Sequence, residues 1–243
     1  SHEAIIAPEE WERVQLELAR RRHSPRRTVC SSPFAGKIVC GDCGEIFGSK
    51  VWHSNSKYRR TIWRCNAKYE SGDLCGTPHL YEDDLKQHFI TALSQLLTDR
   101  TALLEDNKLI LNELLDTAAL DTECDRLLQE LEVVAGMIQQ MINENATKAA
   151  DQAAYAERYN SLVDRYEKLQ AKYDALQQQK ERRQIQAEAI ENCVEALEEL
   201  DLLEITFTDA LWNTVVDHVT VHADKRLVFH CKNGSEVEVS ICK

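Results

Sequence analysis

The sequence predicts an α+β fold. Four cysteines form two pairs near the N-terminus, a long stretch without proline carries two heptad stripes, and residues 201–243 alternate apolar and polar side chains as short strands do. Together these patterns predict a small zinc β-ribbon base completed by a C-terminal helix and β-meander, with a long antiparallel α-helical coiled-coil hairpin inserted.

The two cysteine pairs are candidate metal ligands. Cys40 and Cys43 are separated by two residues and followed by Gly44, which lets the backbone turn so that both thiolates face one ion. Cys65 and Cys75 lie across the following hairpin and supply the other half of a tetrahedral site. Zinc thiolates hold such a short ribbon folded where apolar burial cannot. We therefore expect one Zn²⁺ per chain, bound by these four cysteines.

Three alternatives to this site remain open. A redox Cys-x-x-Cys pair needs a βαβ context, whereas residues 36–39 and 45–47 look like two short strands. Disulfides suit a secreted protein, but the nine cysteines are an odd number and nothing at the N-terminus resembles a signal peptide. His53 or His79 could replace one cysteine ligand. No apolar run is long enough to span a membrane, so we expect a cytoplasmic protein.

Charge is strongly segregated along the chain, although the whole chain carries −12. Residues 20–68 contain twelve Lys or Arg against Asp42 and Glu45, a net charge of +10. Residues 81–200 contain 12 basic and 25 acidic side chains, a net charge of −13. This distribution is typical of a protein in which one module contacts phosphates and another stays away from them. We therefore expect double-stranded DNA as a partner.

The basic stretch has two parts. Residues 20–27 have no apolar periodicity and contain a proline, which predicts an extended linker whose arginines can follow a DNA groove. The second part is a two-stranded ribbon, which fits the major groove. A solvated basic hairpin without a ligand is the alternative. The candidate DNA-binding residues are Arg20, Arg21, Arg22, Arg26, Arg27, Lys50, His53, Ser54, Asn55, Lys57, Tyr58, Arg59, Arg60, Arg64 and Lys68.

Residues 82–200 have the composition of helices, with no proline and one glycine. Apolar side chains recur at alternating steps of four and three from Leu120 to Met141 and again from Tyr155 to Leu176, as at the a and d positions of a coiled coil. If the chain reverses between the stripes, Leu120 faces Leu176 and Met141 faces Tyr155. We therefore predict an antiparallel hairpin, with a local bend where the second stripe becomes polar at Lys180 and Arg183. A plain structural spacer is the alternative role.

The last segment is expected to close the base. Thr208 is the predicted N-cap of a helix that runs to about Asp217, and three strands with an Asn233-Gly234 hairpin turn follow. A lone small meander is unstable, so we expect this one to pack on the zinc ribbon. Three histidines among the strands are interpreted as surface residues rather than a second metal site: His218, His222 and His230.

These features, in this order, resemble the C-terminal part of large serine recombinases, the integrases of phages and of conjugative or mobilisable elements. Residues 2–15 resemble the end of their recombinase domain, Phe34 to Asp84 their zinc ribbon, and Phe207 to Val239 their closing unit. Cys40, Cys43, Cys65 and Cys75 match the family's zinc ligands. The implied domains are the terminal helix of the recombinase domain (1–22), a basic linker (23–33), the zinc ribbon (34–81), connecting helices (82–119), the coiled coil (120–200, tip about 143–154) and the closing helix and meander (201–243).

The resemblance also implies a function. The parent enzyme would be a serine-type DNA recombinase in the bacterial cytoplasm, and this chain, which starts after the catalytic serine's region, would not itself be catalytic. The zinc ribbon would recognise attachment half-sites. Contacts between the coiled coils of recombinase subunits would control synapsis and directionality, together with a directionality factor. The tip residues expected to contact another subunit are Met141, Ile142, Asn145 and Tyr155. The alternative is a stand-alone zinc-ribbon and coiled-coil DNA-binding adaptor or regulator.

Overall fold

The computed structural model describes residues 32–69, 75–147, 152–201 and 204–241. The chain divides into two compact units, one formed by residues up to Leu111 together with residues from Glu188 onward, and the other by Asn112–Ala187. The first unit contains two small sheets and the second a helical hairpin, so the predicted α+β class is confirmed. Within the described residues, no helix has both the length and the apolar composition needed to cross a bilayer.

The ribbon is a three-stranded antiparallel sheet in the order β2-β3-β4. Its strands are β2 (Phe47–Trp52), β3 (Arg60–Cys65) and β4 (Leu80–Tyr81). The pairing of β2 with β3 runs from Phe47↔Cys65 to Trp52↔Arg60. The Phe47↔Cys65 end is buried, whereas every residue from Val51 to Arg60 is exposed. The outer half of this hairpin therefore projects from the core.

A four-stranded sheet joins the ribbon to the C-terminal strands, in the order β1-β5-β6-β7. Its strands are β1 (Ile38–Cys40), β5 (Val216–Val221), β6 (Arg226–Cys231) and β7 (Glu236–Ser240). Strand β1 pairs in parallel with β5, from Ile38↔Val219 to Cys40↔Val221. The meander β5-β6-β7 thus lies directly beside the segment that carries Cys40. The predicted packing of the meander on the ribbon is confirmed.

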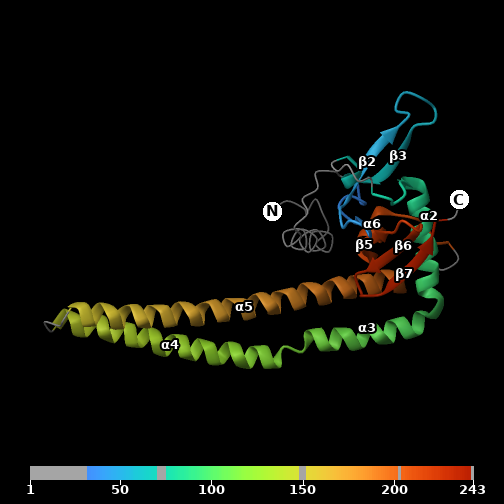
Figure 1. The fold of residues 1–243 in the computed structure, drawn as a ribbon. Coiled ribbons are helices and arrows are strands. Elements are labelled where there is room, and N and C mark those ends of the chain that lie inside the picture. Colours follow the sequence, from blue (N-terminus) through green and yellow to red (C-terminus); the bar gives the residue numbers. More distant parts are fainter. Residues whose placement is uncertain (1–31, 70–74, 148–151, 202–203, 242–243) are drawn as a thin grey trace, which may run out of the picture. The chain divides into compact units, whose positions relative to one another are not determined.

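Aromatic side chains fill the core of this base. Trp212 lies edge-on to Phe34 and Phe89, with ring centroids 4.6 Å and 5.1 Å away. Helix α2 (Glu82–Leu96) supplies Phe89 and contacts β7 (Figure 1), whereas α6 (Asp209–Val215) supplies Trp212. The backbone N–H of Leu211 donates to Oγ1 of Thr208 at 3.1 Å, which confirms the predicted N-cap. Helix α6 ends at Val215 rather than near Asp217, because strand β5 already begins at Val216 and pairs with β6.

The second unit is an antiparallel hairpin of α4 (Ala118–Thr147) and the first part of α5 (Gln152–Glu198), as Figure 1 shows. The two predicted stripes face each other: Leu127, Leu131, Val134 and Leu169 form a buried cluster, with Ile138, Leu162, Tyr166, Tyr173 and Leu176 packed against it. Lys180 pairs with Asp121 across the hairpin, within about one turn of the predicted register. This offset is expected because long side chains lean toward the N-terminus of their own helix.

The helix break lies on the other side of the hairpin from the bend predicted at Lys180 and Arg183: α5 runs unbroken through those residues, whereas Asp116 and Thr117 separate α3 (Arg100–Leu115) from α4. A 3₁₀ turn, η2 (Leu97–Asp99), precedes α3. Oδ1 of Asp116 accepts a hydrogen bond of 3.3 Å from the backbone N–H of Ala118, and this side-chain competition for the backbone starts a new helix. Arg183, one of the two polar steps in the stripe, donates to the carbonyl of Asp116 at 3.0 Å.

Candidate metal centre and basic hairpin

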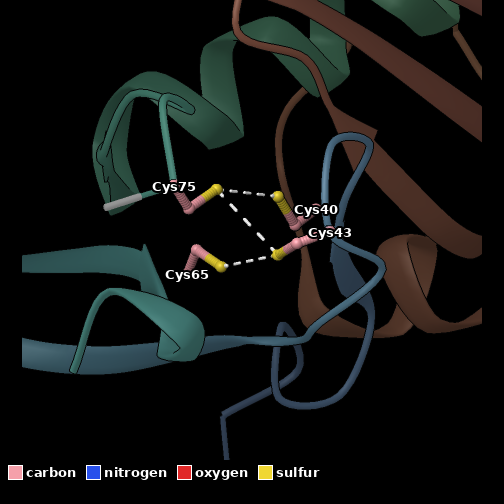
Figure 2. Close-up of side chains that lie close together, drawn as sticks. All are labelled: Cys40, Cys43, Cys65 and Cys75. Carbon is pink, nitrogen blue, oxygen red and sulfur yellow. Dashed lines mark hydrogen bonds between the residues drawn. The ribbon is translucent and has the colours of Figure 1, made fainter. Parts of the chain in front are cut away.

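Four cysteine sulfurs converge at one end of the ribbon (Figure 2). The Sγ atoms of Cys40 and Cys75 are 3.3 Å apart, those of Cys43 and Cys65 are 3.4 Å apart, and those of Cys43 and Cys75 are 3.9 Å apart. All four lie within 4.8 Å of one another. The predicted pairs are therefore brought together, although β2 and β3 separate them in sequence.

Local backbone structure places each thiol. Cys40 ends β1, and its N–H donates to the carbonyl of Glu45 at 2.8 Å, while the N–H of Gly44 donates to the carbonyl of Cys40 at 2.9 Å. Gly44 has a φ of +74°, in the left-handed region that favours glycine, so it allows this tight turn. Cys65 ends β3, opposite Phe47. Each cysteine of the first pair thus lies on a hydrogen-bonded turn.

Thr77 is a buried polar residue beside the sulfurs that the sequence did not single out. Its Oγ1 lies 3.1 Å from Sγ of Cys75 and 3.6 Å from Sγ of Cys40. Lys68 donates to the backbone carbonyl of Thr77, which anchors this loop from the other side. A hydroxyl at this position can orient two of the thiolates. No periodicity marks Thr77, although a polar residue two positions after a ligand is a weak signal.

The thiols differ in their ease of ionisation. Burial alone would raise the pKa of Cys40, but hydrogen bonds from the Cys43 backbone and the Thr77 side chain lower it to about 7. Burial raises the pKa of Cys65, and its contact with the Cys43 thiol raises it further. Sulfurs this close cannot all be thiolates without a neutralising cation, because like charges repel.

The geometry and the donor set fit a metal. With Zn–S bonds of about 2.3 Å, the sulfurs of a tetrahedral zinc site lie roughly 3.8 Å apart. The sulfur–sulfur separations of 3.3 to 3.9 Å and the upper limit of 4.8 Å bracket that value. Four soft thiolates favour zinc over hard cations such as magnesium. The cluster is therefore consistent with a metal site in a zinc ribbon.

The alternative ligands and pairings find no support in the described residues. The His79 ring packs against Trp52 at a tilt of 49°, with ring centroids 4.8 Å apart, and His53 lies in the exposed hairpin turn, so neither belongs to the cluster. The described cysteines are all free rather than disulfide-bonded. Cys40 ends a strand rather than starting a helix, unlike a redox Cys-x-x-Cys.

The β2–β3 hairpin, residues 50–60, gathers most of the predicted DNA-binding side chains. Eight of them lie on its exposed half: Lys50, His53, Ser54, Asn55, Lys57, Tyr58, Arg59 and Arg60. Tyr58 is 61% exposed, with Nζ of Lys57 5.2 Å from its ring centroid. Arg64 and Lys68 are only partly exposed, and Lys68 lies beside the cysteine cluster through Thr77. We call residues 50–60 the basic hairpin.

An aromatic cluster supports the base of this hairpin. Trp52, His79 and Tyr81 contact one another, with ring centroids 4.8 to 6.4 Å apart. The Arg60 guanidinium lies 5.4 Å from the Tyr81 ring centroid, a cation–π contact that holds one hairpin cation in place. Tyr81 was not predicted to take part, because it lies distant in sequence at the end of β4.

Some predicted residues fall elsewhere. Arg20, Arg21, Arg22, Arg26 and Arg27 lie outside the described residues, as does the predicted terminal helix. At the hairpin tip, Met141, Ile142, Asn145 and Tyr155 lie on helices, whereas residues 148–151 are outside the described part. Ile142 is 40% exposed, and the Tyr155 ring stacks on that of Tyr159 at 6.0 Å.

The histidines of the meander have other partners. His218 and His230 stack with centroids 4.1 Å apart, and each shares one hydrogen bond with a carboxylate, Asp217 and Glu236 respectively. The His222 ring lies against Gly41, next to Cys40. Among the described residues, the four cysteines are the group of side chains placed to hold a metal ion.

Fold and cysteine geometry together define a zinc ribbon in the first unit. More specifically, residues 33–94, about a quarter of the chain, match the family model described as the recombinase zinc beta ribbon domain.

Among solved structures, the chain is similar to one described as "Crystal Structure of a LSR-DNA Complex", with 17% sequence identity and a TM-score of 0.31. The match covers 100% of this chain and 66% of that chain, so the protein spans about two thirds of its length. No curated protein matches the sequence.

Proposed function

We propose that this chain is the DNA-binding C-terminal part of a large serine recombinase, a site-specific integrase. The observation that carries the proposal is the match of residues 33–94 to the recombinase zinc beta ribbon domain. The inserted helical hairpin and the closing meander, in that order along the chain, support it. The proposed domains run from the basic linker at 23–33 to the closing unit at 201–243.

One Zn²⁺ per chain is held by Cys40, Cys43, Cys65 and Cys75 in this proposal. Its role is structural, since four thiolates leave no open position for a substrate. The sulfur separations and the Thr77 hydroxyl support this role. A bound zinc would fix the turn after β1 against the end of β3, and so orient the basic hairpin that extends from the same strands.

The basic hairpin contacts double-stranded DNA at the outer part of an attachment half-site. Its cations and polar side chains are all exposed, and a two-stranded ribbon has dimensions suited to the major groove. In this proposal the cations Arg59 and Arg60 bind phosphates, and the polar side chains of Ser54 and Asn55 reach base edges. The arginines at positions 20–27 extend this footprint, and their charge supports a second contact along the DNA.

The helical hairpin acts between subunits. Its acidic faces favour a position away from the duplex, and Met141, Ile142, Asn145 and Tyr155 near its tip are the contacts that decide which sites synapse. Partners are other recombinase subunits on DNA and a directionality factor, in the bacterial cytoplasm. Cleavage belongs to a serine nucleophile in a separate catalytic domain of the parent enzyme.

Two observations test the proposal. The gene should encode a serine-recombinase catalytic motif upstream of Ser1, and the full-length protein should recombine two attachment sites in a plasmid assay. A full-length protein that has this zinc ribbon and binds DNA but lacks both the motif and the activity would instead be a stand-alone adaptor. Exchange of the catalytic serine for alanine is the matched control, because it should abolish recombination and leave half-site binding unchanged.

A further inference from the structure

The C-terminal meander touches the loop that carries the first cysteine pair. The backbone N–H of Gly41 donates a hydrogen bond of 2.8 Å to the carbonyl of Val221, which continues the parallel β1–β5 pairing past Cys40. The next residue of the meander, His222, places its ring directly against Gly41. A residue between two cysteines of the cluster is thus held by a strand near the other end of the chain.

The contact between His222 and Gly41 leaves no room for a side chain. A Cβ on Gly41 would lie 2.6 Å from Nδ1 and 2.7 Å from Cε1 of the His222 ring, and 3.1 Å from Cγ2 of Thr220. Among the described glycines, those with positive φ are Gly36, Gly44 and Gly234, so Gly41 is required for space rather than for backbone conformation. The imidazole therefore forms one wall of the turn that aims Cys40 and Cys43.

The same turn of the meander also contacts the loop of Cys75. A Cβ on Gly76 would lie 3.7 Å from Cβ of Ala223, an ordinary van der Waals contact. His222 and Ala223 are consecutive, and the two loops that they touch carry Cys40 and Cys75, whose sulfurs are 3.3 Å apart. One two-residue segment therefore supports both halves of the cluster.

This supporting segment is itself well anchored. The N–H of His222 donates to the carbonyl of Arg226 at 2.9 Å, and the N–H of Lys225 donates to the carbonyl of His222 at 3.1 Å. The Arg226 guanidinium binds Asp224 at 2.6 Å and reaches Glu238 on β7 at 3.1 Å. The ring of His222 is therefore presented to Gly41 by a hydrogen-bonded turn rather than by a free loop.

We propose that His222 is a positioning residue for the four-cysteine site, so that metal binding and the pairing of β5 with β1 stabilise each other. The proposal rests on the zinc site proposed above. Groups that orient metal ligands without binding the ion contribute to metal affinity, and any ion that binds only the ordered site stabilises the order it needs. The consequence is a metal site that depends on residues 216–226 although its ligands all lie before residue 76.

Variants of Gly41 test the proposal on the intact chain. Gly41→Ala should push the His222 ring away and weaken zinc binding by about tenfold, measured by competition with a chromogenic chelator. The single variant His222→Ala removes the supporting ring without crowding the turn, and it should also weaken zinc binding. Gly136→Ala is the matched control, because a Cβ at Gly136 in α4 would meet nothing within 4 Å apart from its chain neighbours and the adjacent backbone of its own helix. Far-UV circular dichroism reports whether the helices of each variant are intact.

A second experiment removes the metal and measures its effect on the pairing of β1 with β5. Removal of zinc from the unmodified protein should speed hydrogen exchange at the N–H of Val219, which donates to the carbonyl of Lys37 on the β1 side at 2.7 Å, and at the N–H of Gly41. Amides in the middle of α4 should keep their protection.

The outcomes separate this proposal from the metal site itself. Zinc affinity of Gly41→Ala or of His222→Ala equal to that of the unmodified protein, or unchanged exchange at Val219 after zinc removal, would each overturn the coupling and leave the zinc site in place. An unmodified protein that binds no zinc would overturn the metal site, and this inference with it.

Discussion

The indole N–H of Trp212 donates a hydrogen bond of 2.9 Å to the backbone carbonyl of Pro33, 179 residues away in sequence. This bond connects α6, the helix that closes the base, to the residue just before the zinc ribbon. The ring of Phe34, the residue after Pro33, lies edge-on to the same indole. The first unit is thus assembled from the two ends of the described chain, with the helical hairpin inserted between them in sequence.

Loss of one cysteine ligand should remove the metal and unfold the ribbon. Cys43→Ser and Cys75→Ser are each expected to lower the zinc content from one per chain to none, because three thiolates bind far more weakly and the small ribbon depends on the metal. The helices should remain, since their apolar seam does not involve the site. Metal analysis and circular dichroism measure both effects. Cys124→Ala, in the helical hairpin of α4 and α5 (the arm), is the control and should keep its zinc. A folded Cys43→Ser protein with full zinc would contradict the assignment.

DNA affinity should depend steeply on salt through the basic residues. Replacement of Arg21, Arg22, Arg59 and Arg60 by alanine should flatten the slope of log affinity against log salt by about one unit for each phosphate that the variant no longer neutralises. Fluorescence anisotropy with an attachment half-site measures the slope. Arg158→Ala, an exposed arginine on α5, should leave the slope unchanged. Equal slopes for the unmodified protein and the quadruple variant would place the DNA-binding surface elsewhere.

Shortening the hairpin tip should separate DNA binding from synapsis. Trimming residues 143–154 to a short turn removes no basic-hairpin residue and leaves the buried cluster around Leu131 intact. In the full-length enzyme, half-site affinity should therefore stay near its original value, while integration efficiency, the preference for integration over excision, or both should fall. Gel-shift and plasmid recombination assays on the same variant decide it. Collapse of half-site binding with the preferred direction of recombination preserved would assign the tip to DNA binding or folding.

Two adjacent leucines in α4 provide a matched test of the hairpin seam. Leu127 is 1% exposed and lies in the seam, whereas Leu128 is 45% exposed. Leu127→Ala should destabilise the arm by about 2–5 kcal/mol, and Leu128→Ala should change its stability by less than about 0.5 kcal/mol. Thermal unfolding followed at 222 nm, a helix signal, would show the difference. Similar effects of the two substitutions would mean that the arms do not pair through Leu127.

The ion pair between Asp121 and Lys180 should make the arm sensitive to acid. The hydrogen bond from Lys180, with one from Thr117, holds the pKa of Asp121 below its usual value. A carboxyl with a depressed folded-state pKa adds stability above its unfolded pKa, near about 3.9, and that contribution disappears as pH falls through the folded value. The arm's melting temperature should therefore fall less on acidification in Asp121→Asn than in the unmodified protein. Equal decreases would show that the pair contributes nothing.

Much of this architecture was predictable because its signals are local. The stripe from Leu120 to Met141 and the Thr208 cap each depend on neighbours within a few residues, and both predictions were confirmed. The spacing of the two cysteine pairs likewise predicted that their four sulfurs meet at one site, as they do. The class of the fold and the core of the metal centre therefore followed from spacing alone.

Other features were not predictable because they depend on distant contacts. Strand β1 has three residues, too few to show a period, so its parallel pairing with β5 left no local mark. The burial of Lys37, whose Nζ donates to the Val216 carbonyl at 2.8 Å, follows from that pairing. The helix break at Asp116 and Thr117 did carry a signal, since both are common N-cap residues, but the continuous apolar content around them masked it.

The parallel β1–β5 pairing has a consequence for synthesis of the protein. Strand β1 leaves the ribosome well before β5, and at about 5 to 20 residues per second the intervening chain takes roughly ten to thirty-five seconds to translate. During that interval the nascent ribbon exposes an unpaired edge, while the helices, whose contacts are local, can already form. The base is therefore the last part of the chain to be completed, and a chain truncated just after α5 would have a formed arm while strand β1 still lacked its partner strand.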